Sequence, residues 1–339
     1  MKGIWKKVSS IGLVIVLVAM LLTSFPLVSA APPDKCEPWP ECKDSGEEPP
    51  ADPAIAFVRR EKVRGDTIDK IMVMNADGSN QAVIYYEEYF SMTCNPSWSP
   101  DGNSITWCGY TYVPNVPGWN FGVWRIDVEI VDGVPQGTNL QQLVSESDEG
   151  FLSSIAWSPL GNEIAYTVHL YDPGMYKIDA VPATGGTPYN IYTAPEGHAI
   201  DIHGGLAWSS DGTRLATLGG EIAGGSEGTS IMIIDRTTGT VTHRLLTGQF
   251  HFGGLDWTRQ GSNEIAFHAD GVIYTVDIDS GTAVPVVEGS GPSWSPDNSK
   301  IVYKQPASKP NTQNLGTYEF STGNINTLAK GNQPDWRRF

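Results

Sequence analysis

The sequence predicts an all-β protein, a six-bladed β-propeller of four-stranded antiparallel blades, and three observations carry this prediction. Short segments centred on a tryptophan recur along the chain. Each of them is followed by a second stretch with the alternating pattern of a β-hairpin. No stretch after the N-terminal leader has the 3.6-residue apolar period of an amphipathic helix.

The leader is predicted to be a secretory signal peptide over residues 1–30. Three lysines precede an uncharged apolar run at residues 11–22, and small residues lead up to Ala30, where we expect cleavage. The alternative is an uncleaved anchor helix, because the apolar stretch is nearly long enough to span a bilayer. Pro26 and the small residues favour cleavage, and no lipobox cysteine stands at the junction, so neither a lipid anchor nor stable membrane insertion is expected.

Residues 31–53 are rich in proline and acidic residues and are predicted to be a linker, which leaves residues 54–339 for one large domain. The net charge of the chain is −16, and it becomes −19 once the three lysines of the leader are removed. Such a charge repels nucleic acid and anionic lipid, so neither is expected as a partner. The negative net charge is equally consistent with solubility in a secreted protein and with an acidic face that attracts cations.

The four cysteines become informative in an exported protein, because an oxidising compartment permits disulfides. Four cysteines allow three pairings, and we favour Cys36–Cys42 and Cys94–Cys108. The first pair brackets a short proline-rich segment, and the second flanks a predicted hairpin. The alternative is four free thiols.

The repeats are spaced irregularly, with intervals of 59, 51, 49, 37 and 42 residues between successive tryptophans. A period in the forties indicates a solenoid or a propeller. The tryptophans of the repeat are Trp98, Trp157, Trp208, Trp257, Trp294 and Trp336. A tryptophan at the same place in every repeat is expected to pack between adjacent sheets rather than to stack on a ligand.

Turn chemistry favours the propeller. After Trp98 comes Ser-Pro-Asp-Gly, in which proline fixes φ, the aspartate bonds its own backbone and glycine supplies a positive φ. A β-prone segment follows each such turn, for example Ile105–Trp107, so each repeat opens with a hairpin. The second hairpins are predicted over residues 71–85, 123–144, 175–192, 231–246, 272–287 and 316–329.

The first and last repeats are incomplete in complementary ways. The first begins at its second strand, at Ile55, and the last consists only of the segment around Trp336. We therefore predict that Pro334 to about Arg338 pairs with Ile55–Arg59 and closes a ring of six blades, which removes both exposed sheet edges.

The Trp-Ser-Pro-Asp-Gly segment at 98–102 and its variants at 157–161, 208–212, 257–261 and 294–298 resemble those of TolB-like, WD40-related six-bladed β-propellers. The resemblance covers residues 55–339 and implies the fold more strongly than any function. TolB has a further α/β domain ahead of its propeller, whereas a short linker stands there in this chain, so the resemblance does not imply a role in the Tol system.

A candidate ligand site follows from the connections between blades, which lie on one rim of the central channel. Acidic residues and three of the six histidines fall in these connections. The candidate rim residues are Glu149, His198, Asp201, His203 and His251. His203 and His251 hold nearly equivalent places in adjacent blades, and such residues suit a divalent cation. The alternative is that they are ordinary solvated loop residues, because no spacing matches a defined metal motif.

A second candidate surface is the aromatic insert at 109–122, where Tyr112 and Trp119 are expected to stack on a sugar or a peptide. The alternative is a loop that packs on its own blade. His169, His243 and His268 are scattered and are expected at the surface or between blades. The sequence holds none of the common nucleophile, zinc-protease or phosphate-loop signatures.

The function predicted from these features is a secreted or periplasmic, monomeric, non-catalytic binding or scaffold propeller. Its acidic, histidine-containing rim would present a site to a protein, a glycan or a cation. The alternative is a metal-dependent polysaccharide lyase or hydrolase. Secreted oligogalacturonate lyases resemble TolB-like propellers and use channel histidines with a divalent metal. Here only His203 and His251, with His198, are placed for such a role.

Overall fold

The computed structural model describes residues 52–63, 65–87, 91–111, 120–146, 150–170, 174–200, 205–221, 230–246, 252–307 and 313–338. All of them belong to one compact unit. These residues form strands, turns and loops, and no helix occurs among them.

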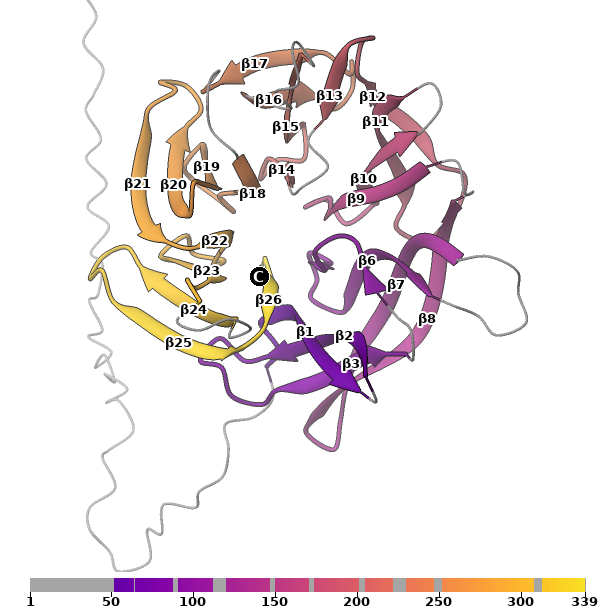
Figure 1. Cartoon of the computed structure of the whole chain (residues 1–339), viewed down its shortest axis with the longest axis vertical. Coiled ribbons are helices and arrows are strands. Elements are labelled where there is room, and N and C mark those ends of the chain that lie inside the picture. The colour runs from indigo at the N-terminus through magenta and orange to yellow at the C-terminus, as the bar shows by residue number, and fades with distance from the viewer. Residues whose placement is uncertain are drawn as a thin grey trace, which may run out of the picture. The chain divides into compact units, whose positions relative to one another are not determined.

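Six antiparallel sheets, the blades, are arranged in a ring (Figure 1). Blade 1 contains β26 (Asn332–Trp336), β1 (Ile55–Val63), β2 (Asp66–Met74) and β3 (Ala82–Tyr86). Blade 2 contains β4 (Ser91–Met92), β5 (Ser97–Trp98), β6 (Ser104–Thr111), β7 (Asn120–Val131) and β8 (Val134–Glu146). Blade 3 contains β9 (Gly150–Trp157), β10 (Glu163–Leu170), β11 (Met175–Pro182) and β12 (Tyr189–Thr193).

The remaining three blades repeat this order from the innermost strand outward. Blade 4 contains β13 (His198–Ile200), β14 (Leu206–Trp208), β15 (Arg214–Glu221), β16 (Ser230–Asp235) and β17 (Val241–Leu245). Blade 5 contains β18 (Phe252–Trp257), β19 (Glu264–Ala269), β20 (Val272–Asp277) and β21 (Ala283–Glu288). Blade 6 contains β22 (Ser290–Trp294), β23 (Lys300–Lys304), β24 (Asn314–Glu319) and β25 (Ile325–Lys330).

The C-terminal strand closes the ring, as the incomplete repeats predict. β26 pairs antiparallel with β1, placing Trp336 opposite Ile55 and Asp335 opposite Ala56. Just beyond the strand, the Arg337 backbone N–H donates to the Ala54 carbonyl at 2.7 Å. In Figure 1, β26 in yellow lies beside β1 in indigo. The two ends of the propeller therefore share blade 1.

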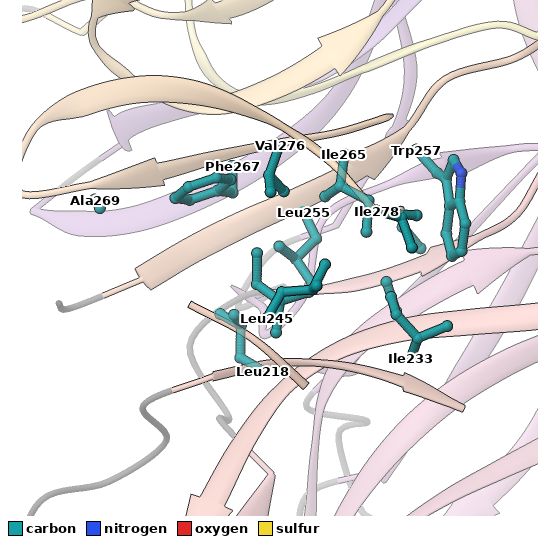
Figure 2. Packing of buried hydrophobic residues seen from close by; sticks show 13 residues of the cluster. Leu218, Ile233, Leu245, Leu255, Trp257, Ile265, Phe267, Ala269, Val276 and Ile278 are labelled. Carbon is teal, nitrogen blue, oxygen red and sulfur yellow. The ribbon is translucent and has the colours of Figure 1, made fainter. Parts of the chain in front are cut away.

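The hydrophobic core is divided into six apolar layers, one at each junction between neighbouring blades. Figure 2 shows the layer between blades 4 and 5, where Leu218 and Ile233 of one sheet face Leu255 and Phe267 of the next. Every tryptophan of the repeat is buried and belongs to one of these layers. The prediction that they pack between sheets is confirmed.

The Ser-Pro-Asp-Gly turns satisfy their own polar groups. Ser99 Oγ donates to Asp101 Oδ1, which also accepts the Asn103 backbone N–H at 3.1 Å. Gly102 adopts φ +72°, and a Cβ there would lie 2.4 Å from Arg337 Cδ. The turn at 295–299 has the same bonds with Asn298 at φ +57° in the glycine position.

The Cys94–Cys108 disulfide is present, with the two Cα atoms 5.4 Å apart. Cys108 lies on β6, whereas Cys94 lies between β4 and β5 rather than on a paired strand. Both are fully buried in the layer between blades 2 and 3. Cys36 and Cys42 lie outside the described residues.

Candidate functional site

The antiparallel order of the strands gives the ring two distinct faces. Two kinds of connection lie at one face of the ring, namely those from the first to the second strand of a blade and those from the third to the fourth strand. This face contains the Ser-Pro-Asp-Gly turns and is called the motif face here. Connections from the second to the third strand, and from each blade to the next, end at the opposite face, called the rim face. Of the site residues expected from the sequence, His198 opens β13 at the rim face. Tyr112, Trp119, Glu149 and His251 fall in chain intervals whose flanking strands end at the rim face, whereas Asp201 and His203 fall in the interval between β13 and β14.

The innermost strand of every blade is interrupted or shifts register near its middle. β4 and β5 are two pieces of one such strand, as are β13 and β14. In the other four blades the register shifts within β9, β18, β22 and β26. Such bulges bend a strand and redirect its side chains. Because these are the innermost strands, the bulges lie next to the axis of the ring.

A set of hydrogen bonds links the innermost strands around the channel. At four of the six junctions, the backbone N–H of a repeat tryptophan donates to the side chain that precedes the tryptophan of the previous blade. The bonds are Trp98 N to Asp335 Oδ2 at 2.7 Å, Trp157 N to Ser97 Oγ at 3.1 Å, Trp294 N to Asp256 Oδ2 at 2.7 Å and Trp336 N to Ser293 Oγ at 2.9 Å. Blades 3 and 4 have Ala156 and Ala207 at this position, and there the Trp208 indole N–H donates to the Ala156 carbonyl at 3.0 Å.

An ion network lies at the same level of the channel. Arg259, only 4% exposed, donates from Nη1 to Asp256 Oδ1 at 2.9 Å. Its Nη2 atom donates to the Trp336 carbonyl at 3.2 Å and lies 3.9 Å from Asp335 Oδ1. These groups and Arg338 surround a cavity of about 50 Å³, which has room only for a few waters.

The narrow channel shifts the ionisation of its charged groups. Burial raises the pKa of Asp335 to about 6, although the Arg259 charge opposes the shift. Burial and the neighbouring Arg259 charge lower the pKa of Arg338 to about 9. Since Asp335 and Asp256 both accept backbone N–H bonds from the next blade, the network joins blades 1, 2, 5 and 6. We therefore interpret it as a structural element rather than a binding site.

Of the predicted rim residues, His198 is described. It opens β13, where it pairs with Glu221, and its Nδ1 lies 3.3 Å from the Glu196 carbonyl oxygen. Glu149, Asp201, His203, His251, Tyr112 and Trp119 lie outside the described residues. Within the described part of the chain, no group of three or more His, Cys, Asp or Glu residues is placed to hold a metal. A metal at His203 and His251 stays a prediction.

The three scattered histidines have different environments. His243 is exposed on β17, and His268 of blade 5 accepts the Gly291 N–H of blade 6 at 3.3 Å, as expected for surface and inter-blade positions. His169 differs, because it stacks on Tyr176 with ring centroids 4.1 Å apart and meets Phe151 edge-on, all within blade 3. An alternating strand places such cross-strand neighbours on one face, so the aromatic stack forms inside the blade.

The sequence reasoning missed a basic cavity of about 500 Å³ on the rim face, at the junction of blades 1 and 6. Its charged lining is Arg59, Arg60, Glu61, Lys62 and Lys330. The sequence feature that indicates this cavity is the run Arg-Arg-Glu-Lys at 59–62, in a chain with a large excess of acidic residues. The net charge of the whole chain does not reveal this local excess of positive charge.

Comparison with solved structures confirms the fold. TolB from Acinetobacter baumannii matches with a TM-score of 0.62 and 18% identity, over 84% of this chain and 66% of that one. A putative TolB from Agrobacterium tumefaciens matches with a TM-score of 0.54 and 18% identity, over 83% and 92%. A chain of a nidogen/laminin complex matches with a TM-score of 0.53 and 10% identity, over 84% and 98%.

These likenesses define the protein as a six-bladed β-propeller of the kind seen in TolB, and the expected resemblance is confirmed at the level of the fold. The chain spans slightly less than two thirds of the Acinetobacter TolB chain. No family model matches the chain, and no curated protein matches it in sequence. In the part of the chain that the structure describes, no helix has the length and hydrophobicity needed to cross a membrane.

Proposed function

We propose that this protein is an extracytoplasmic binding scaffold that captures a protein partner on its rim face. The observation that carries the proposal is the position of the three longest intervals between consecutive strands, which all open at the rim face. These intervals cover residues 112–119, 222–229 and 305–313, contain eight, eight and nine residues, and are flanked by strands that end at the rim face. Binding residues concentrate on loops that a rigid framework positions.

The motif face has a different character. Its first-to-second-strand turns contain five or six residues, and their aspartates and serines bond within the turn. Polar groups engaged in this way offer little to a ligand. The rim-face intervals instead carry Tyr112, Trp119 and His251 in the sequence. Aromatic side chains combined with polar ones are typical of the centres of protein interfaces.

A protein partner and an extracytoplasmic location each have further support. A propeller of the same fold was solved in a nidogen/laminin complex, which fits a propeller that binds protein. The buried Cys94–Cys108 disulfide fits an oxidising compartment, and the predicted signal peptide supplies a route to one. We further propose that the mature protein begins after Ala30 and acts as a monomer.

The test is capture of partners by the mature protein, residues 31–339, from the secretome and envelope fraction of the source organism. Captured proteins are then purified and their affinities measured. A Tyr112→Ser/Trp119→Ser variant should lose binding at least tenfold. The matched control is Leu160→Ser, which removes a side chain that is 64% exposed on the motif face. Equal affinity of the rim variant and the wild type, or loss only in the control, would contradict the proposal.

A further inference from the structure

The rim face contains a notch where the ring closes. β26 pairs with β1 only as far as Val58, which lies opposite Asn332. The next residues of β1, Arg59–Val63, pair with β2 alone. The chain turns directly from β25, which ends at Lys330, through Gly331 into β26, so no residue remains to extend β26 along β1. Five residues of β1 therefore project past the innermost strand.

Among the residues that the structure describes, the other five blades show no such gap. In blade 3 the innermost strand β9 reaches the last residue of β10, and in blade 5 β18 reaches the last residue of β19. In blades 2, 4 and 6 the innermost strands pair with Tyr110, Glu221 and Lys304, at or next to the end of the second strand. The notch is thus specific to the closure of the ring.

Tight packing fixes the edge of the notch. A Cβ built on Gly331 would lie 2.5 Å from the Phe57 ring and 3.2 Å from the Val58 carbonyl oxygen. Only glycine therefore lets the connection run so close to β1. Asn332 Nδ2 donates to Gln313 Oε1 at 2.9 Å, which joins the start of β26 to blade 6 on the other side.

Side chains from both faces of blade 1 line this cavity because it lies at the edge of the sheet, where successive residues point to opposite sides. Arg59 and Glu61 leave one face of β1, and Arg60 and Lys62 leave the other. Lys330 and Gln313 contribute from blade 6. The cavity has a volume of about 500 Å³, within the range of small-molecule sites.

The charges in the cavity do not cancel. Arg60 forms a two-point ion pair with the buried Asp69 at 2.7 and 2.9 Å, and Glu61 pairs with Lys70 at 2.7 Å. Arg59 is held by neutral acceptors, the Gln81 amide oxygen and the Lys330 carbonyl. Among the described residues, Arg59, Lys62 and Lys330 have no carboxylate partner. Three positive charges therefore remain in a protein whose net charge is −16.

We propose that this notch binds a small ligand through an oxyanion, either a carboxylate or a phosphate or sulfate group. The guanidinium of Arg59 suits such groups geometrically, and the two lysines add charge. Thr67, Gln313 and Asn332 line the same cavity and supply hydrogen bonds to hydroxyl groups. This site goes beyond the proposed function, since it requires neither the longer rim connections nor a protein partner.

The experiment is isothermal titration calorimetry of the mature protein with citrate, inorganic phosphate and sulfate, each at low ionic strength. The test variant is Lys62→Gln/Lys330→Gln. The matched control is Lys177→Gln/Lys300→Gln, which removes the same charge from ion-paired lysines in blade 3 and at the motif end of blade 6. Both substituted notch lysines are exposed, so the melting temperature of the notch variant should match that of the wild type.

At least one anion should bind the wild type and the control variant with equal affinity and the notch variant at least tenfold more weakly. The affinity of this anion for the wild type should fall as salt is added. Saturable binding of citrate alone identifies a carboxylate ligand, and binding of phosphate or sulfate identifies a tetrahedral oxyanion. No saturable binding of any of the three, or equal affinities for the notch variant and the control, would overturn the inference. Each single lysine variant supplies the same comparison if the double variant does not fold.

Discussion

Replacing Trp336 by alanine tests whether the C-terminal strand holds the ring closed. Trp336 is 5% exposed and lies in the apolar layer between blades 6 and 1, with Ile55, Phe57 and Met74. Its backbone N–H donates to Ser293 Oγ in blade 6, a bond that the substitution leaves in place. The variant therefore removes side-chain packing at the closure and little else.

The expected loss follows from the size and burial of the side chain. Replacing a buried tryptophan by alanine costs about 3–5 kcal/mol of unfolding free energy. For a domain of this size, each kcal/mol lowers the melting temperature by about 2–4 °C, so a fall of roughly 6–20 °C is expected. Because closure removes two sheet edges, heating the variant should also promote aggregation.

The assay is thermal unfolding followed by circular dichroism, with light scattering recorded in parallel. Tyr86→Ala is the control, since this aromatic lies on the outer strand of the same blade and is 57% exposed. It should change the melting temperature by no more than about 2 °C. If Trp336→Ala melts together with this control, the C-terminal strand does not hold the ring closed.

Three further predictions concern the disulfide, the channel and the metal. Cys94→Ala/Cys108→Ala should lower the unfolding free energy by about 2–4 kcal/mol in urea melts, and free thiols at both positions in secreted protein would refute the pairing. Because the folded-state pKa of Asp335 is raised to about 6, its contribution to stability should fall as pH rises from about 4 to 6. In urea melts between pH 4 and 7, the Asp335→Asn variant should lack this fall in unfolding free energy. If the variant shows the same fall as the wild type, other groups cause the pH dependence and the prediction is wrong. Calcium, manganese or zinc should raise the melting temperature of the wild type but not of His203→Ala/His251→Ala; no shift with any metal would favour solvated rim residues.

The fold was predictable because its repeats carry local chemistry. Trp98 with its following Ser-Pro-Asp-Gly turn encodes a buried anchor and a tight hairpin in adjacent residues, and copies of this unit fix the number of blades. Closure followed from counting, since only a strand around Trp336 could complete a blade that begins at Ile55. The Cys94–Cys108 pair followed in the same way from positions flanking one turn.

The channel and the notch were not predictable, because they depend on contacts between distant repeats. Asp335 and Asp256 stand before tryptophans where other blades have serine or alanine, and their bonds to the next blade appear only once the ring is assembled. The notch exists because β26 is shorter than β1, and a one-residue turn at Gly331 gives no sequence signal of that length difference. A net charge of −16 for the whole chain gives no indication of the basic run at 59–62.

The most direct test of the account asks which face of the ring binds the partner. Glu196→Cys places a thiol at an exposed position on the rim face, and Leu160→Cys places one at an exposed position on the motif face. Each variant is coupled to a maleimide polymer of about 5 kDa, large enough to block the surrounding surface, and its affinity for the captured partner is measured. A binding site on the rim face predicts at least a tenfold loss of affinity for the Glu196 adduct and none for the Leu160 adduct. Loss only with the Leu160 adduct, or unchanged affinity with both, would contradict it.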